Sequence, residues 1–198
     1  MQFSEQDTNS FLIGTQSKTR KKLLQQSGFN FKYLSPNIEE EKILLNENIL
    51  PSKQAMFLAY AKACAICEKI IDKNVICFDT TVHVTNKTIF KSTTKDECMK
   101  VLLMLNNRTH FLYTACIIMK DKKLVWSYAD AAKITFKNNS RKTLEDYIDR
   151  HFNKIVNSVG CYNIESEGQQ VIDKIEGSYY SILGVPLIPL FRIIKKLK

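Results

Sequence analysis

The chain has 198 residues, of which 44% are hydrophobic and 25% charged, with only 6 glycines and 4 prolines. These proportions are typical of a globular protein and exclude a disordered or fibrous one. The formal net charge of +9 favours anionic partners such as nucleotides, nucleic acid or a membrane surface, although lysine runs such as Lys122-Lys123 are equally typical of a solvated surface.

The beginning of the chain gives no sign of export. Residues 1–10 are polar and lack the apolar run of a signal peptide, and no stretch of about 20 apolar residues predicts a membrane span. We therefore expect a polar tail over 1–10 and one domain over 11–198, in a cytoplasmic protein without a membrane partner.

The six cysteines are spread over apolar segments, as expected of buried thiols in a reducing compartment. Cys64 and Cys67 form a C-x-x-C pair, which also occurs in redox and zinc sites. No second pair lies at ligand spacing and both cysteines fall in an alanine-rich helical run, so core packing is the favoured interpretation.

Apolar segments of strand length alternate with segments of helical periodicity along the chain. In chain order we expect a strand over 11–13, a helix ending near Gly28, a strand over 29–34, an acidic loop over 39–41, a helix over about 52–70 and a strand over 75–78. A hairpin over 81–89 turning at Asn86-Lys87, a helix over 95–105, paired strands over 110–119 and 124–136, a helix over 140–152 and a closing helix over 186–197 follow. This alternation predicts an α/β fold with a mixed twisted sheet and flanking helices.

The first polar cluster follows the first predicted strand, at Thr15-Gln16-Ser17-Lys18-Thr19-Arg20. Ligands of α/β folds bind where strands end and helices begin. Hydroxyls and free backbone N–H groups at a helix start attract phosphate, and Arg20 can add a bidentate contact. A simple N-cap by Thr15 or Ser17 explains the same pattern without a ligand, and from this segment alone it is the favoured explanation.

The second polar cluster is Asp79-Thr80, directly after the apolar segment 75–78. A carboxylate at the end of a buried strand can bind a metal or act as a base. It can equally cap the following turn. The two explanations are evenly balanced without further context.

Other charged residues are weaker candidates. Glu39 and Glu40 can supply a second ligand to a hard metal ion or lie in a solvated loop. Lys62 is expected at the edge of a buried helical stripe and Lys91 after a strand end, where each can point into a cleft or extend along the surface. The expected stripe consists of Phe57, Ala61, Cys64 and Ala65. The three histidines (His83, His110 and His151) share no ligand-like spacing, and P-loop, zinc-protease and nucleophile-elbow motifs are absent from the sequence.

Several of these segments match the motifs of one family in order and spacing. The matching segments are Gly14-Thr15-Gln16-Ser17-Lys18-Thr19-Arg20, Asn37-Ile38-Glu39-Glu40, Leu58-Ala59-Tyr60-Ala61-Lys62-Ala63, Cys77-Phe78-Asp79-Thr80, Phe90-Lys91-Ser92, Asn106-Asn107-Arg108-Thr109-His110 and the closing Val159-Gly160-Cys161-Tyr162-Asn163-Ile164-Glu165-Ser166-Glu167-Gly168. From Phe11 to nearly the C-terminus the chain resembles the Maf family of nucleotide pyrophosphatases. The closing segment is similar to that of alphaproteobacterial members.

The resemblance implies two lobes around a central cleft, and an enzyme that hydrolyses canonical, modified or non-canonical nucleoside triphosphates to monophosphate and pyrophosphate. It implies that Asp79 is the proton acceptor, with Lys62 and Lys91 as further catalytic residues, and that Glu40 and Asp79 bind Mg²⁺ or Mn²⁺. The substrate-binding residues that it implies are Thr15, Ser17, Thr19, Arg20, Thr80 and Glu165. A homodimer is also implied.

The sequence departs from the family pattern beside the predicted site. The family's Gly-Ala before the acid is Cys77-Phe78 here, Thr19 stands at an arginine position, and Ser92 replaces a proline. Thr80 follows the pattern of pyrimidine-nucleotide members, whereas Glu165 resembles that of 7-methyl-GTP members. The resemblance therefore leaves the preferred base open.

Two alternative functions remain. An inosine-triphosphate pyrophosphatase would catalyse the same reaction on deaminated purines. A non-catalytic module that regulates cell division would use the positive charge to bind nucleotides or nucleic acid without hydrolysing them. Nucleic acid is the less expected partner, because aromatic and basic residues do not interleave as they do on a stacking platform and the sequence has no groove-reading motif.

Overall fold

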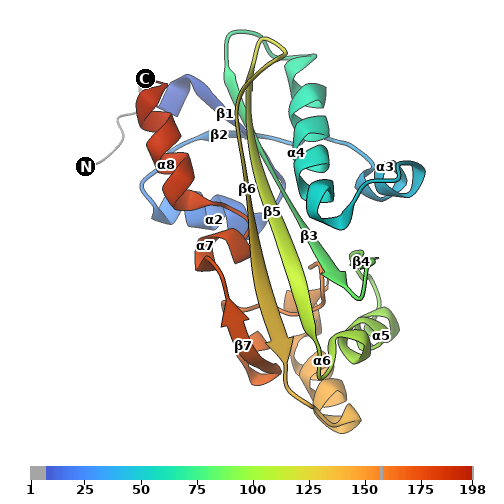
Figure 1. Cartoon of the computed structure of the whole chain (residues 1–198). Coiled ribbons are helices and arrows are strands. Elements are labelled where there is room, and N and C mark those ends of the chain that lie inside the picture. The colour runs from blue at the N-terminus through green and yellow to red at the C-terminus, as the bar shows by residue number, and fades with distance from the viewer. Residues whose placement is uncertain (1–7, 157, 198) are drawn as a thin grey trace. The chain divides into compact units, whose positions relative to one another are not determined.

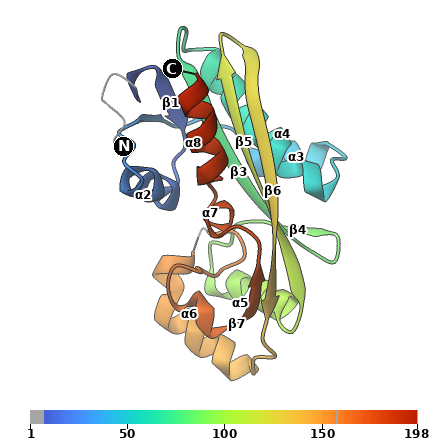
Figure 2. The same cartoon turned by 60° about the vertical axis from the view of Figure 1, so that its left-hand side comes forward.

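The computed structural model describes residues 8–156 and 158–197 (Figures 1 and 2). Residues 1–7 of the predicted polar tail lie outside the described residues. The chain forms two compact units: unit 1 comprises the described residues of 1–80, 113–131 and 178–198, and unit 2 comprises those of 81–112 and 132–177. The long strands β3 (Asn74–Val84), β5 (Thr109–Lys120) and β6 (Lys123–Phe136) contribute residues to both units.

Unit 1 contains the predicted strand–helix alternation near the N-terminus. Its remaining elements are β1 (Phe11–Gly14), α2 (Lys18–Gln26), β2 (Lys32–Leu34), α3 (Glu40–Asn46), α4 (Pro51–Cys67), α7 (Tyr179–Ile182) and α8 (Leu187–Lys196). β1 lies between β2 and β3 and is parallel to both, with Gly14 paired to Leu34 on one side and Cys77 on the other. The loop after β1 therefore begins next to the residues that follow Cys77.

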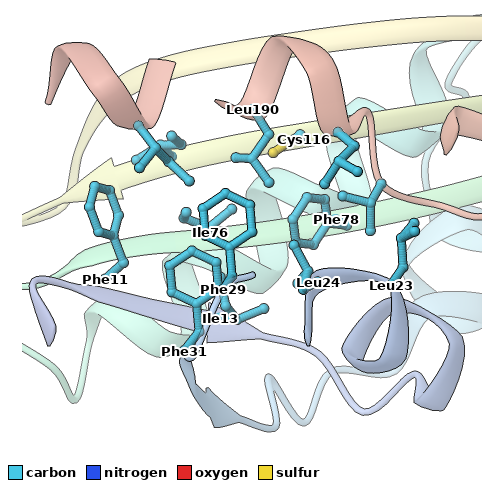
Figure 3. Close-up of a cluster of buried hydrophobic side chains, with 14 residues drawn as sticks. Phe11, Ile13, Leu23, Leu24, Phe29, Phe31, Ile76, Phe78, Cys116 and Leu190 are labelled. Carbon is cyan, nitrogen blue, oxygen red and sulfur yellow. The ribbon is translucent and has the colours of Figure 1, made fainter. Parts of the chain in front are cut away.

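Alternate residues of the strands in unit 1 pack into two separate cores. Ile76 and Phe78 face the core shared with α2 and α8, in which the phenylalanines 29 and 31 stack (Figure 3). Val75 and Cys77 face the opposite core, against the alanine-rich face of α4. Because successive side chains of a strand point to opposite faces, the continuation of β3 turns Asp79 toward α4 and Thr80 toward α2.

Unit 2 contains β4 (Lys87–Ile89), α5 (Lys95–Leu105), α6 (Arg141–Ile155), the 3₁₀ helix η1 (Glu167–Gln170) and β7 (Ile172–Glu176). β4 is antiparallel to the end of β3, with Val82 paired to Ile89. Thr94 and Glu97 form a capping box at the start of α5, a local arrangement that fixes where this helix begins. β7 is antiparallel to the end of β6.

The sheet order is β2-β1-β3-β5-β6-β7, with β4 paired to β3, and it includes both parallel and antiparallel pairs. The predicted α/β fold with a mixed sheet and flanking helices is confirmed. Among the helices of residues 8–156 and 158–197, none combines the length and the apolar character needed to cross a bilayer.

Several predicted boundaries are wrong. The strand expected over 29–34 is limited to 32–34, because Phe29 and Phe31 are used as core side chains ahead of it. The hairpin turns at Thr85-Asn86 and not at Asn86-Lys87. Thr85 and Asn86 both have positive φ. Elements α3, η1, β7 and α7 were not predicted; all of them are short, seven residues or fewer.

Candidate active site in unit 1

Asp79 lies inside β3 and not at its end, which corrects the prediction from sequence. The strand continues for five residues beyond Asp79, so this carboxylate does not cap a turn. Its side chain is 3% exposed and faces α4, as the alternation along β3 requires. A buried carboxylate is costly without a partner, and here the partner is the ammonium group of Lys62.

Lys62 lies on the buried face of α4, and its predicted place at the edge of the buried stripe is wrong. The buried residues of this helix are Gln54, Ala55, Leu58, Ala59, Lys62, Ala63, Ile66 and Cys67. Of the predicted stripe, Phe57 is 39% exposed and the others are half-buried. Lys62 is itself 5% exposed and its Nζ contacts two carboxylates, so it does not extend along the surface.

The second carboxylate belongs to Glu40. The predicted acidic loop over 39–41 is wrong at this point, since Glu40 is the first residue of α3. Glu40 Oε1 lies 2.8 Å from Lys62 Nζ, and its side chain is one-third exposed. Lys62 thus connects a buried carboxylate on β3 with a more accessible one on α3. Glu39 instead pairs with Lys42 on the surface.

Burial is the largest influence on Asp79 and raises the pKa of its carboxyl group above the ordinary value. Lys62 and Arg20 oppose the rise, and the charge of Glu40 adds to it. Because a carboxylate with a raised pKa is a stronger base, this environment suits proton abstraction from water. Glu40, Asp79, Lys62 and Arg20 together carry balanced charges.

The loop after β1 positions Arg20 beside this cluster. Ser17 Oγ accepts a hydrogen bond from Arg20 N at 3.3 Å and caps α2, while Thr15 Oγ1 accepts one from Ser17 N at 3.2 Å. The N-cap explanation is therefore confirmed for Ser17. It is compatible with a phosphate site, because capping by Ser17 satisfies only one of the four free N–H groups at a helix start.

The Arg20 guanidinium is held by three acceptors. Nε donates to Gly184 O at 3.0 Å, Nη1 to Phe78 O at 3.3 Å and Nη2 to the hydroxyl of Thr80 at 3.1 Å. Burial lowers the pKa of Arg20, while the charges of Asp79 and Glu40 raise it. Of the five N–H groups of an arginine, two remain to bind an anion in a fixed orientation.

Gly184 is required where Arg20 crosses the C-terminal segment. Its φ of +88° lies in the left-handed region that favours glycine, and a Cβ at this position would lie 2.7 Å from Arg20 Nε. The carbonyl of Gly184 can accept from Arg20 only because no side chain stands between them. No local sequence pattern predicts that Gly184 belongs to the site, because its partner Arg20 is 164 positions away.

Three further residues of the predicted site make no contact with this cluster that the structure describes. Thr19 is half-buried on α2 and is not among the contacts of Arg20. Lys91 and Glu165 belong to unit 2. Lys91 is exposed and forms an antiparallel bridge with Val159, and the exposed Glu165 donates its backbone N–H to Asn163 Oδ1 at 2.9 Å.

The substitutions beside the acid are explained by the two cores of unit 1. Cys77 packs against α4 and Phe78 packs between α2 and α8. Both are strand residues with buried side chains, so they fill the sheet faces rather than a loop. The predicted role of all six cysteines as core thiols is consistent with the structure, in which each of them is free.

The histidines, cysteines and other acids are the remaining candidates for a metal site. Among the described residues, clusters of three or more histidine, cysteine, aspartate or glutamate side chains that could hold a metal ion are absent. His83 and His110 are buried, and burial lowers the pKa of each to about 4, so both are neutral. A metal ion in unit 1 would therefore depend on two carboxylates together with groups from a ligand.

Comparisons with known proteins identify the family of the chain. A family model described as Maf-like protein matches residues 10–197. The chain is 35% identical over 186 residues to a nucleoside triphosphate pyrophosphatase of Caulobacter vibrioides, covering 92% of this chain and 93% of that protein. It is 29% identical over 190 residues to a nucleoside triphosphate pyrophosphatase of Pelagibacter ubique, covering 94% and 97%. It is 30% identical over 183 residues to a 7-methyl-GTP pyrophosphatase of Bartonella quintana, covering 92% of each chain.

These matches extend over nearly the whole chain and include alphaproteobacterial proteins, as the closing sequence segment predicts. They favour neither an inosine-triphosphate pyrophosphatase nor a non-catalytic regulator. The chain belongs to the Maf family of nucleoside triphosphate pyrophosphatases, and it is a hydrolase.

Proposed function

We propose that unit 1 binds the triphosphate of a nucleotide and that Asp79 accepts a proton from the attacking water. The oxygen of that water forms a bond to the α-phosphorus, and the bond from the α-phosphorus to the oxygen bridging it to the β-phosphorus breaks. The products are a nucleoside monophosphate and pyrophosphate. The observation that carries the proposal is the buried pair of Asp79 and Lys62, with Glu40 and Arg20 beside it.

Each residue of the cluster has a separate part. Lys62 holds Asp79 in one orientation and keeps it ionised despite its burial. Arg20 has two N–H groups left for phosphate oxygens, and its three existing hydrogen bonds prevent it from moving. Thr15 and Ser17 shape the loop before α2, whose backbone N–H groups favour an anion. In unit 1, Thr19 and Thr80 are proposed to contact the base or sugar. For Lys91 and Glu165, which belong to unit 2, phosphate binding and contact with the base or sugar stay predictions from the family resemblance.

The charge balance of the cluster supports a requirement for a divalent cation. The two positive charges of Lys62 and Arg20 are already matched by Glu40 and Asp79. A triphosphate adds about four negative charges, and further positive charge is needed to hold it. Glu40 and Asp79 are oxygen donors of the kind that Mg²⁺ and Mn²⁺ prefer, together with phosphate and water. When bound, the cation would neutralise charge on the phosphates.

The proposal predicts metal-dependent release of pyrophosphate. With Mg²⁺ or Mn²⁺ present, the purified chain should release pyrophosphate from at least one nucleoside triphosphate. Excess EDTA should reduce the rate by at least about a hundredfold, since metal ions contribute several kcal/mol to such transition states. Undiminished release in EDTA would exclude the metal requirement, and no release from any nucleotide would exclude the activity.

The same measurement identifies the substrate class. The panel contains the canonical ribo- and deoxyribonucleotides, 7-methyl-GTP and inosine triphosphate. Relatives of this chain carry the names nucleoside triphosphate pyrophosphatase and 7-methyl-GTP pyrophosphatase, so we propose that the preferred substrate lies among canonical nucleotides and 7-methyl-GTP. A preference for inosine triphosphate by more than tenfold would contradict this.

The free cysteines, five of them buried, support a cytoplasmic location.

We also propose that the enzyme is a homodimer that pairs through β6. β7 pairs with β6 over 133–136, and the segment of β6 over 123–131 has no strand on that side in the described part of the chain. Leu124 is 54% exposed and Val125 39%, on an edge strand that carries no charge from 124 to 129.

Such an edge pairs readily with another strand. An antiparallel second copy brings the end at Lys123 next to the end at Asp130, so the charges are complementary and the contact closes on itself. The mass in solution, measured by light scattering at about 50 μM, should be twice that of the chain. A Val125→Lys variant should be monomeric, and a monomeric unmodified protein at this concentration would refute the proposal.

A further inference from the structure

A series of hydrogen bonds runs from Arg20 through two threonine hydroxyls to the C-terminal segment of unit 1. Arg20 Nη2 lies 3.1 Å from Thr80 Oγ1, and the hydroxyl oxygens of Thr80 and Thr114 are 3.0 Å apart. Thr114 Oγ1 in turn lies 2.8 Å from the carbonyl oxygen of Ser181. The series joins α2, β3, β5 and α7.

The direction of every hydrogen bond in this series is fixed by its two ends. A guanidinium only donates, and a carbonyl oxygen only accepts. Thr114 must therefore donate its single proton to Ser181 O, which leaves it as an acceptor toward Thr80. The proton of Thr80 points at Thr114, and Thr80 accepts from Arg20.

The buried end of the series is held rigidly. Thr114 is 1% exposed and Ser181 3%. Ser181 Oγ donates to Asp130 Oδ2 at 2.6 Å, which ties α7 to β6. Thr114 shares the sheet face of Cys116 and Ile118, where α2 and α8 pack, so water cannot replace its hydroxyl without opening that core.

Thr80 is the half-buried threonine of the series, and the second lone pair of its hydroxyl oxygen can accept a hydrogen bond from a ligand. We propose that Thr114 is a positioning residue that holds Thr80 as a hydrogen-bond acceptor, so that Thr80 selects nucleotides presenting a donor group. The donor is an amino group of the base or a hydroxyl of the sugar. A carbonyl oxygen at the same place would face a lone pair and be rejected. This inference rests on the proposed function.

The test compares Thr114→Val with the unmodified enzyme and with Thr114→Ser. Valine has nearly the same shape but cannot accept from Thr80, whose proton becomes free to rotate toward the nucleotide. CTP and UTP differ at position 4 of the base by an amino donor against a carbonyl acceptor, with the opposite change at N3, and GTP and dGTP differ by the 2′ hydroxyl. In one of these pairs, the ratio of kcat/KM values should shift about tenfold toward the nucleotide without the donor.

The change should come mainly from KM, because Thr114 does not touch the reacting water, and Thr114→Ser should restore the original ratio. Ratios in Thr114→Val within twofold of the unmodified enzyme for both pairs would overturn the proposal. If Thr114→Val does not fold, Thr80→Val and Thr80→Ser provide the same comparison: the first should lose the discrimination and the second should keep it. An unmodified enzyme that hydrolyses no nucleotide would instead refute the proposed function.

Discussion

Replacing Asp79 with Asn is expected to abolish pyrophosphate release while leaving the fold intact. Asparagine is almost the same size and removes a buried negative charge, and Lys62 keeps Glu40 as its partner. The loss of a general base alone costs about 10²–10⁴-fold in rate, and the loss of a metal ligand would add to this. The measurement is kcat for pyrophosphate release, together with a thermal unfolding curve.

The matched control is Asp149→Asn, which changes an exposed carboxylate on α6 that pairs with Lys95. This variant should retain activity within about twofold, because an exposed ion pair contributes little. Near-normal turnover in Asp79→Asn would remove Asp79 from the mechanism. A loss of activity accompanied by unfolding would be uninformative about chemistry, and the unfolding curve separates that result from a true catalytic defect.

Replacing Lys62 with Met should produce the largest loss of stability among the variants of this site. Methionine fits a buried helical face, but the substitution leaves Asp79 buried without its cation. Breaking a buried ion pair in this way costs about 3–5 kcal/mol. Glu40 is one-third exposed and can turn toward solvent, whereas Asp79 cannot. Urea denaturation measures the change.

The double variant Lys62→Met with Asp79→Asn separates charge from packing. It should recover most of the lost stability, because no unpaired charge remains in the core, and it should stay inactive. Lys42→Met is the surface control: this lysine pairs with Glu39 where both side chains are largely exposed, so its loss should cost less than about 1 kcal/mol. A Lys62→Met variant as stable as the original protein would show that the pair contributes nothing.

The alternation of side chains along β3 specifies which way Asp79 and Thr80 point, although the predicted end of the strand excluded both residues. Ending the strand at Phe78 made Asp79 a residue of a turn. Continuing the alternation by two residues turns Asp79 to the face of Cys77, and Thr80 to that of Phe78. The continuation is hard to detect because the apolar run over 75–78 is followed by three polar residues, Asp79, Thr80 and Thr81.

The burial of Lys62 could also be predicted from the sequence. A stripe through Ala55, Leu58, Ala59 and Ile66 includes Lys62, but the large side chain of Phe57 favoured a different face. Small alanines are the buried residues here because α4 packs closely on the sheet. The contacts of Arg20 with Gly184, by contrast, join residues 164 positions apart, and no local pattern of one sequence specifies such a pairing.

The order in which unit 1 is assembled follows from its three separate chain segments. Its first segment ends at Thr80, but its last begins at Ser178, so ribosomal synthesis delivers all of unit 2 in between. Until that last segment emerges, Arg20 lacks the carbonyl of Gly184 and α2 lacks the apolar face of α8. A nascent chain therefore cannot complete the proposed triphosphate site until the segment that begins at Ser178 has been translated. Chains released earlier are expected to be inactive and to expose the phenylalanines that pack against α8.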